Sequence, residues 1–395
     1  MKQDDRVGRP ALAGPLDGIR VLDLTSVVLG PMATQILGDL GADVIKIEGP
    51  EGDLMRSNGV SRHPGLSSIY LALNRNKRSV VLDLKTEDGK AGLRALIADA
   101  DVLVHNMRVS AIERLGFGYA AAAAINPRLV YCVATGFGQD GPDRDKPAFD
   151  DIIQAACGLV GLLTPEGERP EYVPSLIADK TVGMALANAV LAALLHRERR
   201  GEGQQVEVPM LETMASFIMA EHLGGLTFAP PTGGAGYARL LQGGRRPART
   251  RDGWICALPY TDRHWRAFFE SAGRGHLLDQ FDISDRAQRN ANIRMLYAQM
   301  AEITVERTTA EWLALFAELD IPATPILALD DVPQHPHLQA VGLFQETTHP
   351  TAGPLREMRP AARFSATPLS LRRHAPTLGE HTEEVLSAAG IKTAP

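Results

Sequence analysis

Two short apolar runs near the N-terminus, at residues 18–24 and 42–47, most strongly limit what this chain folds into. Between them lies Met32–Leu40, which follows Pro31 and ends before Gly41, as a helix does. A strand, a helix and a second strand form a βαβ unit, which builds parallel sheets covered by helices. Three further apolar runs continue the pattern, at residues 79–84, 101–105 and 129–134. We therefore predict a large doubly wound, Rossmann-like α/β domain whose first part spans residues 11–210.

The longest helical pattern follows Asp179. From Val182 to Leu194 apolar residues recur at the i, i+3, i+4, i+7 spacing of a buried helical face. Basic residues and then Gly201 end the pattern, as they commonly end a helix. Asp179 is predicted to be the N-cap of this helix, and the residues alone favour a capping role over a catalytic one.

The composition changes beyond this helix. Residues 224–251 are rich in Gly, Pro and Arg and predict an irregular connection. A strand at residues 253–258 and three helical segments then predict a smaller α-rich domain at residues 225–330. The expected linkers on either side are residues 211–224 and 331–354. The segment 355–395, with a final helix at 380–389, is expected to return to the large domain.

Composition and charge exclude several classes of protein. The 395 residues carry a net charge of −6, which favours neither nucleic acid nor an acidic membrane as a partner. Cys132, Cys157 and Cys256 are far apart and odd in number, so we expect no disulfide framework and a reducing cytoplasm. We find no signal peptide and expect no membrane span, since no apolar run approaches the roughly 18 residues required.

Common catalytic motifs are absent or incomplete. The glycines at 136, 138 and 141 fit a dinucleotide fingerprint, but a Pro- and Asp-rich loop follows instead of the required helix. His335 and His337 have no third ligand nearby in the sequence, so no metal site is expected. A basic cluster has two interpretations, a solvated loop or a phosphate contact. Its members are Arg75, Lys77, Arg78 and Lys85.

Motifs in a fixed order along nearly the whole chain resemble the class III CoA-transferases. They include G-I-R-V-L-D-L-T at 18–25, G-P-M-A-T-Q-I-L-G-D-L-G-A-D-V-I-K-I-E at 30–48, N-R-N-K-R-S-V-V-L-D-L-K at 74–85, T-G-F-G-Q-D-G-P at 135–142, F-D-D-I-I-Q-A-A-C-G at 149–158 and A-P-T-L-G-E-H-T-E-E-V-L at 375–386. No single motif decides the resemblance, which depends on their collinearity.

The resemblance implies a nucleophilic role for Asp179. In these transferases the matching carboxylate attacks an acyl-CoA donor, and anhydride and aspartyl-CoA thioester intermediates pass CoA to a carboxylic acid acceptor. Coenzyme A is then a substrate, and no tightly bound cofactor is expected. The positions that match CoA contacts in the family are Val28, Leu29, Leu82, Lys85, Asn106, Met107, Arg114, Thr135 and Phe137.

Departures from the family pattern bear on the alternatives. Gly49 stands where some transferases carry arginine, and Ser110 replaces a glycine. The racemase branch of the family uses a histidine where this chain has Phe149. The phenylalanine side chain cannot donate or accept a proton, so transfer is favoured over racemisation. A CoA-binding protein without turnover is a further alternative.

The family fold implies an interlocked, ring-shaped homodimer whose large domain is built from both chain ends. The Arg-rich stretch 239–251 would place a guanidinium against the second carboxylate of a dicarboxylic acceptor, or else forms an exposed linker.

Overall fold

The structure is a computed structural model that describes residues 14–164, 167–241, 243–281 and 286–391. The chain divides into two units. The larger unit comprises Met1–Ile218 and Val341–Pro395, and the smaller unit comprises Met219–Ala340. Both ends of the chain therefore contribute to the larger unit.

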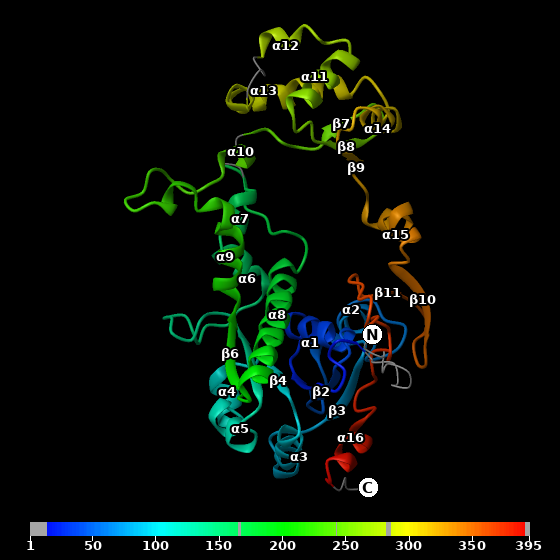
Figure 1. Cartoon of the computed structure of the whole chain (residues 1–395). Coiled ribbons are helices and arrows are strands. Elements are labelled where there is room, and N and C mark those ends of the chain that lie inside the picture. The colour runs from blue at the N-terminus through cyan, green and yellow to red at the C-terminus, as the bar shows by residue number, and fades with distance from the viewer. Residues whose placement is uncertain (1–13, 165–166, 242, 282–285, 392–395) are drawn as a thin grey trace, which may run out of the picture. The chain divides into compact units, whose positions relative to one another are not determined.

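Six parallel strands form the central sheet of the larger unit, in the order β3-β2-β1-β4-β5-β6 (Figure 1). Their bounds are β1 (Arg20–Leu24), β2 (Asp43–Glu48), β3 (Lys77–Val81), β4 (Val102–His105), β5 (Val130–Thr135) and β6 (Gln204–Pro209). Strands β2 and β3 are added on one side of β1, and β4, β5 and β6 are then added on its other side. The predicted α/β fold with a central parallel sheet is confirmed.

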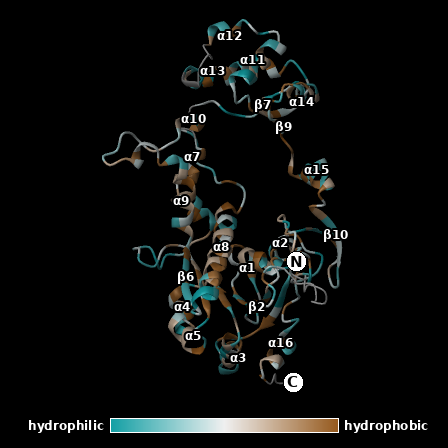
Figure 2. Ribbon diagram, in the orientation of Figure 1, coloured by the Kyte–Doolittle hydropathy of each residue, from teal (hydrophilic) through white to brown (hydrophobic). Residues whose placement is uncertain are grey.

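Helices cover both faces of this sheet, because neighbouring strand residues point to opposite sides. Val21 packs into one buried cluster and Leu22 into the other. The first face is covered by α1 (Leu29–Asp39), α6 (Asp150–Ala156), α7 (Leu159–Leu163), α8 (Ile177–Arg200) and α9 (Met210–His222). The second face is covered by α3 (Glu87–Ala98), α4 (Val109–Arg114), α5 (Tyr119–Ile125) and α16 (Thr382–Ala388). Apolar residues accordingly gather at the sheet (Figure 2).

Helix α8 is long and apolar enough to cross a membrane by length and composition, so the prediction that no segment reaches this threshold is wrong. Half of its most apolar stretch is buried inside the structure, against α1 and the sheet. The physical reason for its composition is therefore its position as the central core helix of the larger unit.

The remaining elements of the larger unit surround this core. They are η1 (Leu54–Arg56), α2 (Ser68–Leu73) and the hairpin of β10 (Phe344–His349) with β11 (Gly353–Met358). Residues 211–224, expected as a linker, are mostly helix α9. The hairpin begins inside the expected linker 331–354, because its strands contain no apolar run that would predict them from the sequence.

The smaller unit has a core rich in aromatic rings. Phe268 lies against Trp265, Trp312 and Phe316, and all four side chains are fully buried. Its strands are β7 (Ala248–Arg249), β8 (Trp254–Ala257) and β9 (Ala323–Pro325), and its helices are η2 (Gly224–Thr227), α10 (Ala238–Leu241), α11 (Asp262–Ser271), α12 (Leu277–Gln280), α13 (Arg286–Thr304), α14 (Thr309–Glu318), η3 (Leu329–Gln334) and α15 (Pro336–Ala340).

Candidate active site

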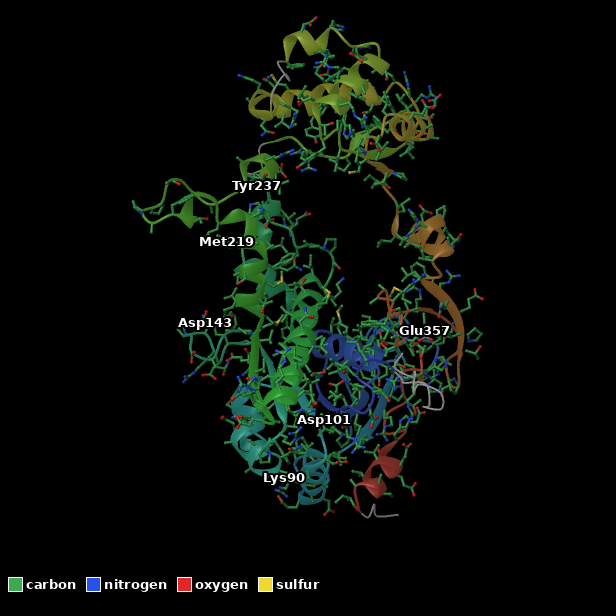
Figure 3. The ribbon with its side chains drawn as sticks, in the orientation of Figure 1. Lys90, Asp101, Asp143, Met219, Tyr237 and Glu357 are labelled. Carbon is green, nitrogen blue, oxygen red and sulfur yellow. The ribbon has the colours of Figure 1, made fainter. Side chains whose placement is uncertain are left out.

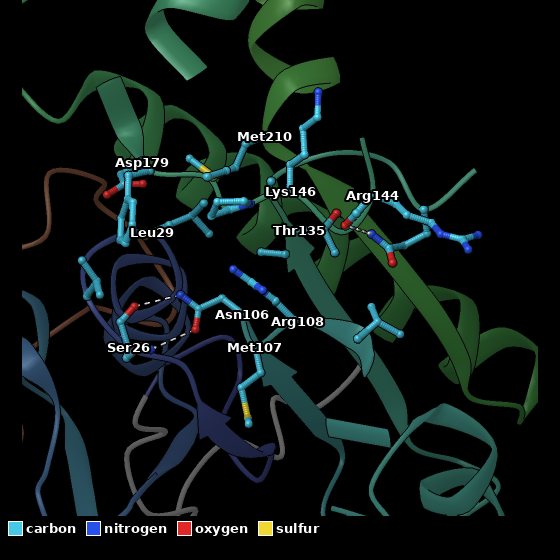
Figure 4. A pocket seen from close by; sticks show the side chains of 18 residues that line it. Ser26, Leu29, Asn106, Met107, Arg108, Thr135, Arg144, Lys146, Asp179 and Met210 are labelled. Atoms are coloured by element: carbon cyan, nitrogen blue, oxygen red, sulfur yellow. Dashed lines mark hydrogen bonds between the residues drawn. The ribbon is translucent and has the colours of Figure 1, made fainter. Parts of the chain in front are cut away.

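A cavity of about 280 Å³ opens at the carboxyl edge of the sheet (Figure 4). Ser26, Asn106 and Thr135 line it and come from the ends of β1, β4 and β5. These strands are parallel, so their carboxyl ends meet at one edge, and β1 and β4 flank the point where the strand order reverses. Figure 3 labels Asp101, which directly precedes β4, and Asp143, which lies in the loop that follows β5.

Asn106 joins the ends of β1 and β4 across this reversal. Its Oδ1 accepts a hydrogen bond from the Ser26 N–H at 3.0 Å, and its Nδ2 donates to the Ser26 carbonyl oxygen at 2.8 Å. A single amide side chain therefore satisfies both backbone groups of Ser26. This pair of bonds fixes the floor of the cavity.

Asp179 lies in the wall of the cavity, and its side chain is about 8% exposed. The prediction that Asp179 is the N-cap is wrong, because α8 begins at Ile177 with Leu176 in the cap position. Asp179 is the third residue of the helix. Its own N–H donates to Asp150 Oδ2 at 2.9 Å, so a carboxylate from α6 satisfies this helix-end amide instead.

The Asp179 carboxyl group is held in an unfavourable place for negative charge. Burial, together with the nearby carboxylates of Asp150 and Asp151, raises its pKa from 3.8 to about 7. Within the described ranges, no side chain or backbone group donates a hydrogen bond to its oxygens. A carboxylate in these surroundings is poorly solvated and therefore more reactive toward an electrophile.

Helix α1 begins beside Asp179 because α1 and α8 pack closely. A Cβ atom at Gly183, one turn beyond Asp179, would lie 2.7 Å from the Leu29 carbonyl oxygen, so only glycine fits there. Leu29 and Asp179 both line the cavity. The first residues of α1 thus bring a helix N-terminus, with its positive dipole end, to the carboxylate.

The Gly136–Gly141 loop forms another wall. Glu212 Oε1 accepts from the Gly138 N–H at 2.8 Å, and Glu207 Oε1 accepts from the Gln139 N–H at 2.9 Å. A Cβ at Gly138 would meet Glu212 Oε1 at 2.3 Å, so the Glu212 carboxylate would have to move away from the loop. The next helix begins only at Asp150, so the dinucleotide fingerprint lacks its helix, as the sequence indicated.

The cavity is also lined by three cationic side chains that were not predicted from the sequence: Arg108, Arg144 and Lys146. Asp179 is the one carboxylate among the lining residues, so the surface favours an anionic ligand. Their positions after β4 and β5 were the available signal, because side chains at strand ends in such sheets face the ligand.

The basic cluster of residues 75–85 is mostly committed to internal pairs. Arg75 pairs with Asp39 at 2.6 Å, and Lys77 pairs with Asp23 at 3.0 Å, both fully or nearly buried. Arg78 pairs with Asp43 at 2.6 Å. The phosphate interpretation is therefore wrong for these three residues, and within the cluster only Lys85 lines a cavity at the carboxyl edge of the sheet.

That second cavity, of about 490 Å³, lies at the ends of β1, β2 and β3, with Leu82 and Lys85 in its lining. Ser26 and Met107 line both cavities, so the two are neighbours along one edge of the sheet. The structure thus brings together Leu29, Leu82, Lys85, Asn106, Met107, Thr135 and Asp179. Val28, Arg114 and Phe137 line neither cavity, and the first and last of these are buried.

Metal chemistry finds no support among the side chains that the structure describes. In the part of the chain that the structure describes, no three His, Cys, Asp or Glu side chains gather as a metal site. The strand order, with cavities at the carboxyl edge beside its reversal, is that of nucleotide-binding α/β proteins.

Comparison with known proteins gives the family. A family model described as CoA-transferase family III matches residues 16–382, and the chain therefore belongs to this family, as predicted. The chain is 32% identical over 380 residues to the succinate–glutarate CoA-transferase of Agrobacterium fabrum, which covers 94% of this chain and 95% of that protein.

A second relative and a solved structure agree. The formyl-CoA:oxalate CoA-transferase of Shigella sonnei is 32% identical over 404 residues, which cover 96% of each chain. A crystal structure of a CAIB/BAIF family protein from Brucella suis matches with a TM-score of 0.81 and 29% identity, covering 95% of this chain and 100% of that chain. The prediction of a CoA-transferase family enzyme is confirmed.

Proposed function

We propose that this enzyme transfers CoA from an acyl-CoA donor to a carboxylic acid acceptor, with Asp179 as the nucleophile. The observation that carries the proposal is the Asp179 carboxyl group, which faces the cavity with its pKa raised to about 7 and without a hydrogen-bond donor among the described residues. Membership of CoA-transferase family III supports the reaction class.

The exchange balances without any added acid or base. An Asp179 oxygen attacks the thioester carbonyl carbon, the C–S bond breaks, and the CoA thiolate departs. The product is a mixed anhydride between the Asp179 carboxyl group and the donor acyl group. The thiolate then attacks the Asp179 carbonyl carbon, which releases the donor acid and forms an aspartyl-CoA thioester. The acceptor carboxylate repeats these two steps in reverse order, so acyl-CoA product forms and the Asp179 carboxylate is restored.

Groups around Asp179 would stabilise the negative charges that form during this exchange. The N-terminus of α1 would stabilise the oxyanion that forms when the thioester carbonyl is attacked. The second cavity would hold the adenosine end of CoA beside Leu82 and Lys85, and Ser26 and Met107 would lie along the path of CoA between the two cavities. Because the second cavity also has acidic residues in its lining, the phosphates would lie toward the cations of the first cavity.

The acceptor that we propose is a dicarboxylic acid. The names of the two relatives each include one, glutarate and oxalate. Arg108, Arg144 and Lys146 would supply cations for CoA phosphates and for the second carboxylate. The Arg239–Arg251 stretch lies in the smaller unit, where Arg251 pairs with Glu311 and Arg239 lies over the Tyr260 ring. Its role in the acceptor site stays a prediction.

Phe149 disfavours the racemase alternative. Its side chain is about 67% exposed, lines the cavity and carries no proton. Moving a proton from one face of an α-carbon to the other needs a second acid or base on the opposite face. Phe149 cannot serve as that group, whereas thioester exchange needs none.

The test is to incubate the protein with an acyl-CoA and quench with hydroxylamine, which converts an Asp179 acyl intermediate to a hydroxamate that peptide mass spectrometry detects. Asp179→Ala should give no adduct, whereas Asp88→Asn, an exposed first-turn aspartate of α3, should give the normal yield. Deuterium uptake at the acyl α-carbon without an adduct would support the racemase. CoA binding with neither result would support a protein without turnover.

We also propose that the protein is a homodimer of interlocked subunits. Large apolar side chains are exposed on α8 and α9, among them Met184, Leu195 and Phe217. A second copy of the chain would bury these residues. Light scattering at micromolar concentration should give twice the chain mass, and a monomeric mass would contradict the proposal.

A further inference from the structure

The turn between β1 and α1 contains a strained residue. Val27 has a φ of +72°, in the left-handed region that β-branched residues avoid because Cβ crowds the backbone. Val27 also lines the first cavity. Such conformations persist only where surrounding groups enforce them, and they concentrate at functional sites.

Asp53 is the group that enforces this conformation. It reaches the turn from the segment after β2, and its Oδ1 accepts hydrogen bonds from the Val27 N–H at 3.2 Å and the Met55 N–H at 2.9 Å. Its Oδ2 accepts from Lys46 Nζ at 2.8 Å. Lys46 Nζ also donates to the Thr25 carbonyl oxygen at 2.9 Å. One buried ion pair therefore holds the backbone on both sides of Ser26.

Stability alone gives a poor account of this arrangement. Lys46 is fully buried and Asp53 is about 5% exposed. A buried ion pair of this kind commonly contributes no more to stability than apolar side chains of equal volume. A valine with positive φ destabilises the fold. The pair and the strained turn both call for a reason beyond folding.

The turn decides where helix α1 begins. The Val28 carbonyl oxygen accepts the Met32 N–H, so Val28 occupies the cap position and the Leu29 and Gly30 N–H groups follow it. Within the described residues these two N–H groups have no hydrogen-bond acceptor. Asp179 and Leu29 share the cavity, so the course of the turn sets where these donors lie relative to the carboxylate.

We propose that Asp53, supported by Lys46, is a positioning residue that holds the Val27 turn so that the first N–H groups of α1 and the Asp179 carboxylate meet the same thioester. This inference rests on the function proposed above. Misplacing a reacting group by about 1 Å costs up to about 100-fold in rate. Loosening the turn should therefore slow formation of the Asp179 adduct more than it weakens CoA binding.

Two paired variants isolate the effect. Asp53→Leu with Lys46→Met removes both charges and the acceptor for the Val27 N–H. Asp53→Asn with Lys46→Met removes both charges and the Lys46–Thr25 bond, as the first pair does, but keeps an oxygen acceptor for the Val27 N–H. The control is Asp39→Leu with Arg75→Met, which removes another buried ion pair, at 2.6 Å, from the other end of α1.

The measurement is the single-turnover rate constant of adduct formation, with the CoA Kd from calorimetry. We expect Asp53→Leu with Lys46→Met to lower the rate constant by about 10- to 100-fold, with Kd changed less than about threefold. Asp53→Asn with Lys46→Met and the control pair should stay within about threefold of the wild type. A purely structural role would instead lower the amplitude through unfolded protein, at an unchanged rate constant.

Val27→Gly covers the case in which Asp53→Leu with Lys46→Met fails to fold. Glycine adopts this φ without strain, so the variant should melt no lower than the wild type. Glycine also lets the turn adopt other conformations, so the adduct should form about tenfold more slowly. Wild-type rate constants in the folded Asp53→Leu pair or in Val27→Gly would overturn this inference and leave the proposed function standing. An equal loss of rate in the control pair would do the same. A wild-type protein that binds CoA but forms no adduct would overturn the proposed function with it.

Discussion

Replacing Asp179 by asparagine should change how stability depends on pH. The folded protein raises the pKa of this carboxyl group from 3.8 to about 7, so the folded state binds its proton more tightly than the unfolded state. The associated stability is fully present below about pH 4. It is lost as pH rises toward 7, because the buried site must then hold a charge. Asparagine does not ionise and escapes this loss.

The size of the effect follows from the two pKa values. A shift of about 3 units corresponds to about 4 kcal/mol over the whole range, at 1.36 kcal/mol per unit. Between pH 5 and pH 8 the difference in unfolding free energy between Asp179→Asn and the wild type should grow by about 2.6 kcal/mol. With an unfolding entropy of about 2.1 cal/mol/K per residue, this corresponds to about 3 °C in Tm.

The assay is thermal unfolding followed by circular dichroism at pH 5, 6, 7 and 8. Asp88→Asn is the matched control, since Asp88 lies in the first turn of α3 and is exposed. Its Tm should follow that of the wild type at every pH. A constant gap between Asp179→Asn and the wild type from pH 5 to pH 8 would refute the reasoning, as would an equal slope in the control.

Four other outcomes follow from the site. Gly183→Ala should lose about 1–3 kcal/mol of unfolding free energy in denaturant, because its Cβ would force α1 and α8 apart, whereas Gly161→Ala, with open space around its Cβ, should lose none. Gly138→Ala should slow adduct formation, because its Cβ would collide with the Glu212 carboxylate; a wild-type rate would contradict this. Asn106→Ala should raise the CoA Kd about tenfold by calorimetry, since Ser26 loses two hydrogen bonds. Adduct formation should accelerate from pH 5 to pH 8 as Asp179 ionises, and a flat profile would contradict its raised pKa.

Five of the six strands could be predicted because they contain apolar runs that are mostly buried, whereas β6, with its half-buried and exposed polar residues, was missed. Strand β3 shows where this rule fails. The prediction began at Ser79 and ran to Leu84, whereas the strand is Lys77–Val81. Lys77 is fully buried, but its charge is satisfied by Asp23, Thr34 and Asn74, so a polar residue occupies a core position. Hydrophobic periodicity cannot detect a buried charge whose partners lie elsewhere in the chain.

The same limit applies to the site. Asp179 was found through its resemblance to a family, and not through its helix position, which the sequence misplaced. Its pKa depends on Asp150 and Asp151, which are distant in sequence and come close only through the packing of α6 against α8. Arg108 lies in the stretch N-M-R-V-S at 106–110, which resembles the family pattern, whereas Arg144 and Lys146 stand in a loop without a recognisable motif. Their common feature is spatial, because all three follow carboxyl ends of strands.

The C-terminal segment has a consequence for how the protein is made. Val385 and Leu386 fill one face of the sheet, and Pro376 and Gly379 bond to Arg56 and Ser79. These residues are synthesised after the whole of the smaller unit, so the part of the sheet face that α16 covers stays open while the intervening chain is made. The larger unit is therefore completed only after the smaller unit has been synthesised. Until α16 arrives, that part of the face is a surface for chaperones, and a chain that stops before Thr382 leaves it open.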